Sequence, residues 1–463
     1  MSAKVMLLNV ICKLFAKKQH FTWKVFKNDL PLQARKDYYY RIMKRIRLFM
    51  TTVLLAFLTT GQAQKYVGGD ISLLPTYEEH SANYMDQDGQ PIADMLSWLK
   101  EQGWNSVRVR LFVDPSLAPD KAKGEGVRQD LEYVKAFGKR IKEAGLDFML
   151  DFHYSDTWAD PAHQATPASW IPKPNENSIP TEEIIYQYTK DCLEQLVAAN
   201  AAPDFIQTGN EISWGMLWEE GCKLEAKSNW SGYKDDNWDK FSEMLKSAGK
   251  ACREVCPDAK IIIHTEQAAN TPLVTDFYQR IADNGVDYDI IGTSYYPYYH
   301  GSLTQLEKTI TQWETTFPNK KIMVVETGCA YHWAVGDNDQ GYELSYEGQR
   351  KFTADLIAML NKHGNVNGLF WWFPEANEYG LDWDTQRVTD AWYNAGLFDN
   401  ETGRALPALY ELKNFCDGGT GIRTIQSAPT GDKAWYSLQG HRLESQPSQT
   451  GIYINNKKKV IIK

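Results

Sequence analysis

The stretch Asp204-Phe205-Ile206-Gln207-Thr208-Gly209-Asn210-Glu211 decides how the rest of the chain is interpreted. It follows Pro203 and reads as a short apolar strand that stops at a polar Gly-Asn-Glu tip. In a parallel barrel the carboxyl ends of the strands carry the chemistry, so Glu211 is a functional candidate. A second apolar run, Lys321-Ile322-Met323-Val324-Val325-Glu326, also stops at a glutamate. Two carboxylates at two strand tips indicate a glycosidase.

Strand and helix patterns alternate on both sides of these two runs. The apolar runs that we expect to form strands are 66–71, 107–112, 148–153, 204–208, 260–264, 288–295, 321–326 and 368–373. Strict alternation predicts an α/β fold with a parallel sheet, and eight repeats predict a closed (β/α)8 TIM barrel. No G-x-G-x-x-G motif follows any of these runs, so an open dinucleotide-binding sheet has no support.

The composition suits one large domain that binds an uncharged, ring-shaped substrate. The 463 residues are enough for one barrel of roughly 250 to 400 residues and some appendages. A net charge of −9 argues against nucleic acid as a partner. The 16 Trp and 25 Tyr exceed the usual needs of packing, and their amphipathic rings are what a sugar-binding cleft requires. Most of these rings are nevertheless expected in the core.

The N-terminal region, 1–63, has the pattern of a secretory signal. Lys44-Arg45-Ile46-Arg47 precedes the apolar run 48–58, and a cleavage site is expected after Ala63. We expect the true start at Met43 or Met50, and the run is too short to span a membrane. The signal predicts a secreted, periplasmic or cell-surface protein. Export permits a disulfide, but the six cysteines that follow the signal are scattered, and buried thiols are the alternative.

The domain boundaries follow from where the alternation stops. The catalytic barrel is predicted to cover residues 64–416, and 417–463 form a linker and a short C-terminal β-rich tail. Within that tail, 434–443 and 451–463 alternate like two short strands around turns. The tail resembles the C-terminal sorting segments of the Gram-negative type IX secretion route, and a small β-module is the alternative.

Cleavage of a glycosidic bond needs two carboxyl groups in different protonation states, which Glu211 and Glu326 can supply. The glutamate with apolar or acidic neighbours keeps its proton, and the one bonded to cationic or hydroxyl donors stays ionised. Two pairs of residues could donate to the ionised carboxylate, namely Arg108 or Arg110 and Tyr295 or Tyr296. Both arginines lie on one face of their strand, so the pattern does not choose between them.

Several further side chains follow strand tips and are candidates to bind substrate. Asn210 can donate to a sugar 2-hydroxyl. His153 begins the polar and aromatic run that contains Asp156 and Trp158, a composition more typical of a substrate loop than of packing. Trp372, in the run 370–373, is a candidate floor of the cleft. A buried core histidine and a tryptophan that only fills the barrel rim are the structural alternatives.

These blocks together resemble glycoside hydrolase family 53, the arabinogalactan endo-β-1,4-galactanases. The resemblance rests on five blocks in one consistent order between about residues 65 and 415: 69–72, 105–110, 151–161, 209–218 and 325–328. It implies a retaining endo-hydrolase of β-1,4-galactan, the side chains of pectin, with Glu211 as acid/base and Glu326 as nucleophile. It also implies that Asn210, His153, Tyr295 and Trp372 line the subsites beside the scissile bond.

The resemblance implies no catalytic cofactor but raises the question of a structural calcium ion. In the similar bacterial proteins an acidic calcium loop follows the nucleophile strand. Here Gly336-Asp337-Asn338-Asp339-Gln340-Gly341 offers the carboxylates of Asp337 and Asp339 but lacks the histidine that follows in the usual run. Such oxygens suit calcium, and a solvated turn has the same composition. The expected partner is the galactan polysaccharide, bound by a monomer.

Three other hypotheses differ from a galactanase in testable ways. A retaining hydrolase of another β-linked glycan would share the two glutamates, because the fold does not select the substrate. A non-catalytic glycan-binding protein on the same barrel would not need both glutamates. A metal-dependent hydrolase would need a cluster of His or Asp at the strand tips, which the sequence does not indicate.

Overall fold

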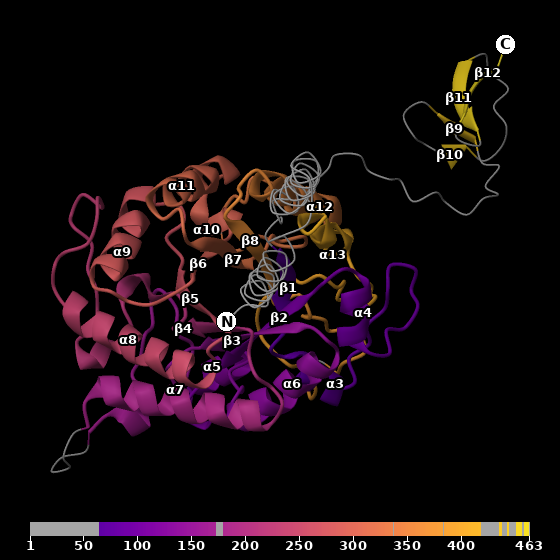
Figure 1. The fold of residues 1–463 in the computed structure, drawn as a ribbon. Coiled ribbons are helices and arrows are strands. Elements are labelled where there is room, and N and C mark those ends of the chain that lie inside the picture. The colour runs from indigo at the N-terminus through magenta and orange to yellow at the C-terminus, as the bar shows by residue number, and fades with distance from the viewer. Residues whose placement is uncertain are drawn as a thin grey trace, which may run out of the picture. The chain divides into compact units, whose positions relative to one another are not determined.

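The computed structural model describes residues 64–172, 179–336, 338–382 and 384–417, together with short strands beyond residue 434. Eight parallel strands close into a barrel in sequence order (Figure 1). They are β1 (Tyr66–Asp70), β2 (Ser106–Leu111), β3 (Asp147–Phe152), β4 (Phe205–Thr208), β5 (Lys260–Thr265), β6 (Ile290–Tyr295), β7 (Lys321–Thr327) and β8 (Val366–Trp372). Each predicted strand is present, and the ends differ by one or two residues. The predicted (β/α)8 barrel is confirmed.

Helices surround the strands, as Figure 1 shows. They are α3 (Leu74–Glu79), α4 (Met95–Glu101), α5 (Asp120–Gly124), α6 (Leu131–Glu143), α7 (Thr181–Ala198), α8 (Trp238–Val255), α9 (Thr271–Asp283), α10 (Pro297–His300), α11 (Leu303–Thr316), α12 (Tyr346–Leu360) and α13 (Pro407–Glu411). Short 3₁₀ turns lie at 115–117, 168–170, 212–214, 218–220 and 412–415. Helix α6 illustrates the local signals: the Asp130 carboxylate accepts from the N–H of Tyr133 at its start, and its apolar stripe faces the core. No described helix combines the length and the apolar character needed to cross a membrane.

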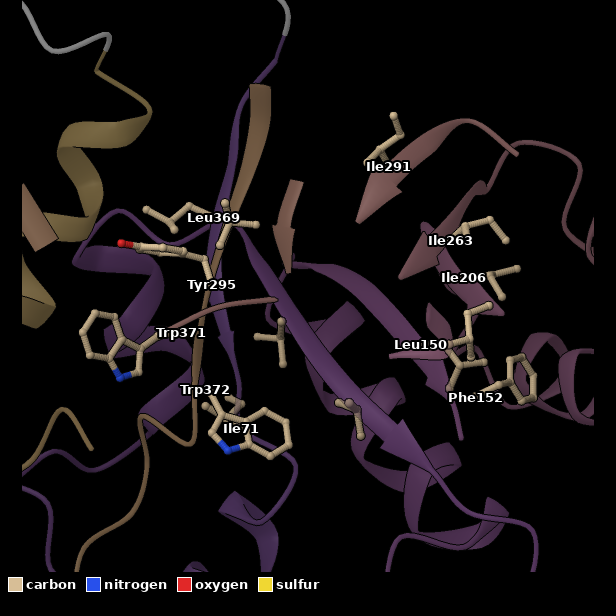
Figure 2. Close-up of a cluster of buried hydrophobic side chains, with 14 of the residues drawn as sticks. Ile71, Leu150, Phe152, Ile206, Ile263, Ile291, Tyr295, Leu369, Trp371 and Trp372 are labelled. Carbon is tan, nitrogen blue, oxygen red and sulfur yellow. The ribbon is translucent and has the colours of Figure 1, made fainter. Parts of the chain in front are cut away.

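The core has two layers because neighbouring side chains on a strand point to opposite faces. One layer fills the barrel interior and consists of Met149, Phe205, Ile262, Ile290, Met323, Val325 and Phe370. The other lies between strands and helices, where Figure 2 shows Leu150, Phe152, Ile206 and Ile263 among its members. Above the interior layer, Asp151 and Gln207 continue the inward-facing positions of β3 and β4. Polar side chains therefore fill the barrel toward its carboxyl end.

The described cysteines are free thiols: Cys192, Cys222, Cys252, Cys256, Cys329 and Cys416. The first five are buried, which agrees with the alternative of buried thiols.

The C-terminal tail contains strands, as predicted, but twice as many. The stretches 434–443 and 451–463 each hold two strands: β9 (Trp435–Ser437) and β10 (Arg442–Leu443), then β11 (Gly451–Asn455) and β12 (Lys458–Ile462). They pair antiparallel in the order β10-β9-β11-β12. The expectation of one strand per stretch was wrong, because each stretch folds back on itself within a few residues.

The predicted signal at 1–63 lies outside the described residues.

Candidate active site

The chain turns sharply after β4, and this turn aims Glu211 across the mouth of the barrel. Gly209 has a φ of +96°, a value that favours glycine, and Glu211 itself is left-handed with φ 49° and ψ 51°. A glutamate in this region is strained, and such strain occurs where a functional side chain must be held in one direction. Tyr154 after β3 and Phe373 after β8 adopt the same region. Local strain therefore shapes several strand tips on this face.

The two predicted glutamates do meet at the carboxyl end of the barrel. One oxygen of Glu211, one oxygen of Glu326 and a ring nitrogen of His264 all lie within 4.8 Å of one another. Retaining glycosidases hold their two carboxyl groups about 5 to 5.5 Å apart, whereas inverting enzymes need about 6.5 Å or more. The separation of at most 4.8 Å between these two oxygens is shorter than the inverting range.

Glu211 sits in surroundings that favour its protonated form. Burial and the neighbouring charges of Glu326 and Glu266 raise the pKa of Glu211 well above its ordinary value. The hydroxyl of Ser294 donates to Glu211 Oε1 over 2.6 Å and opposes this rise. At neutral pH the carboxyl group is thus able to act as a proton donor.

Glu326 has the donors that an ionised partner needs. Arg108 Nη2 lies 2.9 Å from Glu326 Oε1, and the hydroxyl of Tyr296 donates to Oε2 over 3.0 Å. Burial raises the pKa of Glu326, the charge of Arg108 and the Tyr296 hydroxyl oppose the rise, and the resulting pKa is about 7. The two carboxyl groups therefore differ in their hydrogen-bond donors and in how far the pKa of each is raised.

The structure selects between the two arginines of β2. Both are fully buried, but only Arg108 reaches Glu326; it also pairs with Asp70 over 2.7 Å and Asp151 over 2.8 Å. Arg110 pairs with Asp70 over 2.8 Å, and its guanidinium group lies over the ring of Trp372. Arg108 therefore holds Glu326, and Arg110 supports the aromatic wall.

Asn210 belongs to a hydrogen-bonded layer beneath the glutamates. Its Oδ1 accepts from Arg108 Nη2 over 2.8 Å and from Gln207 Nε2 over 3.2 Å, and its Nδ2 donates to the carbonyl of Ala159 over 2.8 Å. An amide nitrogen has two hydrogens, so one remains for a sugar hydroxyl. Asn210 lines the cleft, which suits the predicted role.

A cleft of about 830 Å³ opens above the glutamates. Its walls carry both glutamates and seven Trp and Tyr rings: Trp158, Tyr296, Tyr299, Trp333, Trp372, Trp392 and Tyr393. Trp372 packs edge to face against Trp158 and against Trp392, with 6.1 Å between the ring centroids in each pair. Such surfaces stack the apolar faces of pyranose rings. The predicted placement of Trp158 and Trp372 in the cleft agrees with this geometry.

Two predicted substrate residues are not among those that line the cleft. His153 Nδ1 accepts from the N–H of Ala159 over 3.0 Å, and His153 Nε2 lies 3.2 Å from Asp151. Asp156 accepts the N–H groups of Asp114 and Ala168 over 3.0 and 2.8 Å. Neither is among the cleft-lining residues, because both side chains tie the loop after β3 to its neighbours. In this structure they hold the loop after β3 in place.

Tyr295 requires a correction. Its hydroxyl donates to the carbonyl of Gly301 over 2.8 Å, and its ring stacks on Phe352 of α12, outside the barrel. Tyr296 faces the cleft and holds Glu326. The resemblance therefore pointed to the wrong member of the pair, since adjacent side chains at a strand end leave on opposite sides.

Among the described residues, no group of three metal-ligating side chains includes Asp339. Asp337 lies outside the described residues, and Asp339 Oδ1 accepts from the N–H of Gly341 over 2.8 Å in an exposed turn. Among the described side chains the metal-competent grouping contains Glu211, His264 and Glu326, not Asp339. Calcium binding by this loop stays a prediction.

The grouping of His264 with the glutamates was not foreseen. Both ring nitrogens already have partners: Nε2 lies 2.8 Å from the Ser294 hydroxyl, and Nδ1 meets donors on Gln207 and on the main chain of Glu211. These contacts describe a hydrogen-bonded acid/base network. Sequence reasoning placed His264 and Ser294 only on strands; their position near the tips of β5 and β6 was the available signal.

The fold, the pair of close carboxyl groups and the aromatic cleft define a glycoside hydrolase of the two-glutamate barrel class. The family model of glycosyl hydrolase family 53 matches residues 66–412. The chain therefore belongs to glycosyl hydrolase family 53.

Named relatives and solved structures agree with this membership. The chain is 32% identical to an arabinogalactan endo-β-1,4-galactanase of Thermothelomyces thermophilus, over 67% of this chain and 90% of the relative. It is 30% identical to one of Cellvibrio japonicus, over 80% of this chain and 97% of the relative. A solved catalytic domain of the family from Ignisphaera aggregans is 32% identical with a TM-score of 0.65, and the match covers 76% of this chain and 97% of that one.

Proposed function

We propose that this glycoside hydrolase cleaves β-1,4-galactan, including the galactan side chains of pectin, internally and with retention of anomeric configuration. The observation that carries the mechanism is the separation of at most 4.8 Å between oxygens of Glu211 and Glu326. The substrate follows from the relatives named as arabinogalactan endo-β-1,4-galactanases. The aromatic cleft is consistent with a neutral polysaccharide.

The reaction proceeds in two displacement steps. In the first, an oxygen of Glu326 forms a bond to the anomeric carbon as the glycosidic bond breaks, and Glu211 gives its proton to the leaving oxygen. In the second, Glu211 takes a proton from water, the water oxygen bonds to the anomeric carbon, and Glu326 leaves as a carboxylate. Arg108 and the Tyr296 hydroxyl stabilise that carboxylate before and after the covalent intermediate.

Two substitutions test the roles of the glutamates. Glu326→Gln should abolish hydrolysis of galactan but preserve binding, because the side chain keeps its size and loses its nucleophilic charge. Glu211→Ala should lose activity on galactan steeply and less on an aryl β-galactoside with an acidic phenol, which departs without a proton. Glu225→Gln, at an exposed glutamate, is the matched control. Wild-type galactan hydrolysis by either active-site variant would refute the assignment.

Covalent trapping tests retention directly. A 2-deoxy-2-fluoro-β-galactoside with a good leaving group should leave a stable glycosyl adduct on Glu326, identified by peptide mass spectrometry. An adduct at another residue, or a first product of inverted configuration, would contradict the mechanism. A reducing-sugar assay across galactan, glucan, mannan and xylan tests the substrate; preference for one of the last three would contradict the galactan assignment.

The proposal includes export and action as a monomer. The basic residues 44–47 followed by the apolar run 48–58 support an exported protein. Cell fractionation should find the protein outside the cytoplasm, and sedimentation should give the mass of one chain. A cytoplasmic location or a stable oligomer would refute the respective part.

A further inference from the structure

A buried hydroxyl lies between the two glutamates and is not used in the mechanism above. Ser294 is fully buried; its Oγ is 2.6 Å from Glu211 Oε1 and 3.4 Å from Glu326 Oε2. A hydroxyl has one proton, so it donates to one carboxyl group at a time. The shorter distance assigns that proton to Glu211.

An irregularity of the barrel brings Glu326 beside Ser294. Along the β6 and β7 pair, Thr293 lies opposite Val324, but Ser294 lies opposite Glu326, so Val325 is an extra residue of β7. Such a bulge changes the direction in which the following side chains point. It leaves Val325 in the interior core and Glu326 at the mouth, on the same side of the sheet as Ser294. The 3.4 Å approach of Glu326 to the Ser294 hydroxyl depends on this one-residue shift.

His264 fixes the direction of the Ser294 proton. The main-chain N–H of Glu211 donates to His264 Nδ1 over 3.3 Å, and Gln207 Nε2 lies 3.0 Å from the same atom. Nδ1 is therefore an acceptor, although Asn210 Oδ1 also lies 3.0 Å away. Burial lowers the pKa of His264 well below its ordinary value, so the ring is neutral and carries its hydrogen on Nε2. Nε2 then donates to Ser294 Oγ over 2.8 Å.

These three contacts form a closed circuit. The Glu211 N–H donates to His264, His264 donates to Ser294, and Ser294 donates to Glu211 Oε1. The circuit begins and ends on the same residue, so it holds the main chain and the carboxyl group of Glu211 in one relative orientation. Because Oε1 is occupied by the Ser294 hydrogen bond, the transferable proton resides on Oε2.

We propose that Ser294, oriented by His264, is the positioning residue of Glu211: it keeps the transferable proton on Oε2 and stabilises the carboxylate left after proton transfer. This inference rests on the proposed role of Glu211 as acid/base. The Ser294 proton itself is never transferred. Its hydrogen bond strengthens when Oε1 changes from a neutral to a charged acceptor, which eases the first step and prepares the base for the second.

Other charged and titratable groups also act on Glu211 and stay in place when Ser294 is changed. They are Glu326 on β7, Glu266 and His264 on or after β5, Asp160 after β3, Tyr296 and Tyr299 after β6, and Arg108 on β2, which acts through Glu326. Because these groups are common to the wild type and the variant, a difference between the two reports the Ser294 hydroxyl.

The test is the pH profile of kcat/KM on galactan for Ser294→Ala. The alkaline limb reports loss of the Glu211 proton in the free enzyme. Without the hydroxyl the carboxylate loses a donor, so this limb should move to higher pH by about one unit. Thr293→Val is the matched control, because the Thr293 hydroxyl donates to the main-chain carbonyl of Ser294 and not to a carboxylate. Its limb should stay at the wild-type position.

Two changes at His264 complete the test. His264→Gln can still donate to Ser294 and should keep the alkaline limb near its wild-type position, whereas His264→Leu should shift it in the same direction as Ser294→Ala. Thermal unfolding of each variant shows that the fold is retained. An unshifted limb in Ser294→Ala, or an equal shift in Thr293→Val, would overturn the inference. If Glu211→Gln kept wild-type activity, the proposed function itself would fail, so the two failures are distinguishable.

Discussion

Replacing either of two adjacent tyrosines by phenylalanine distinguishes the role of the cleft-facing hydroxyl of Tyr296 from that of the outward-facing hydroxyl of Tyr295. The Tyr296 hydroxyl donates to Glu326 Oε2 over 3.0 Å, whereas the Tyr295 hydroxyl donates to the carbonyl of Gly301 over 2.8 Å. Both rings are buried, and each substitution removes one oxygen. Tyr296→Phe should therefore change the chemistry at Glu326, and Tyr295→Phe should change only stability.

The size of the effect follows from the contacts that remain. A hydrogen bond to a charged group contributes about 1.5 to 3 kcal/mol, which equals about one to two pH units of pKa. Arg108 stays 2.9 Å from Glu326 Oε1, and Ser294 lies 3.4 Å from Oε2, so part of the loss is offset. We expect the pKa of Glu326 to rise by about one unit. The nucleophile must be ionised, so the acidic limb of kcat/KM moves up by the same amount.

The assay is kcat/KM on galactan between pH 4 and 9 for the wild type and both variants. On the acidic side Tyr296→Phe should be roughly tenfold less active than the wild type. Tyr295→Phe should keep the wild-type limb and lose about 1 kcal/mol of unfolding free energy, measured by urea denaturation. An unmoved limb in Tyr296→Phe, or the same shift in both variants, would refute the assignment of Tyr296 to the nucleophile.

Two further substitutions probe buried charges. Burial raises the pKa of Glu375 to about 8, above the value of about 4.3 in an unfolded chain. The protonated side chain therefore contributes fully to the unfolding free energy below about pH 4, and this contribution is lost as the pH rises through 8. Glu375→Gln should match the wild type in unfolding free energy at pH 4 and exceed it at pH 9 by at most about 5 kcal/mol; equal urea midpoints at pH 9 would contradict this. Arg108→Met leaves Asp70 paired with Arg110 alone and leaves Asp151 without its close cation. The unfolding free energy should fall by about 3 to 5 kcal/mol. A wild-type urea midpoint would show that the network is not stabilising.

The fold could be predicted because its signals are local. Strands such as Lys321–Thr327 are continuous apolar runs, and the turns between strands and helices carry their own residues. Only a parallel sheet accepts such runs in alternation with helices, so eight repeats predict the barrel. The tail shows the limit of this reasoning, since a pattern of alternating residues does not reveal a reversal inside it.

The two glutamates could also be predicted, because a strand that ends on a carboxylate points it to the functional face of a barrel. Arg108 and Tyr296 could be reduced to one of two residues each, and no further. The choice within each pair depends on strand register and on which side of the sheet a side chain leaves, and the local pattern is the same for both members.

The amino-acid sequence by itself determined the barrel, its strand order and the two acidic residues, because periodicity and strand endings are properties of short segments. The tertiary structure alone decided the network around them. A left-handed turn after β4 brings Glu211 to Ser294, a one-residue bulge in β7 brings Glu326 beside the same hydroxyl, and His264 joins them from a third strand. Contacts between residues 30 to 83 positions apart arise from the closure of the barrel, which no local pattern encodes.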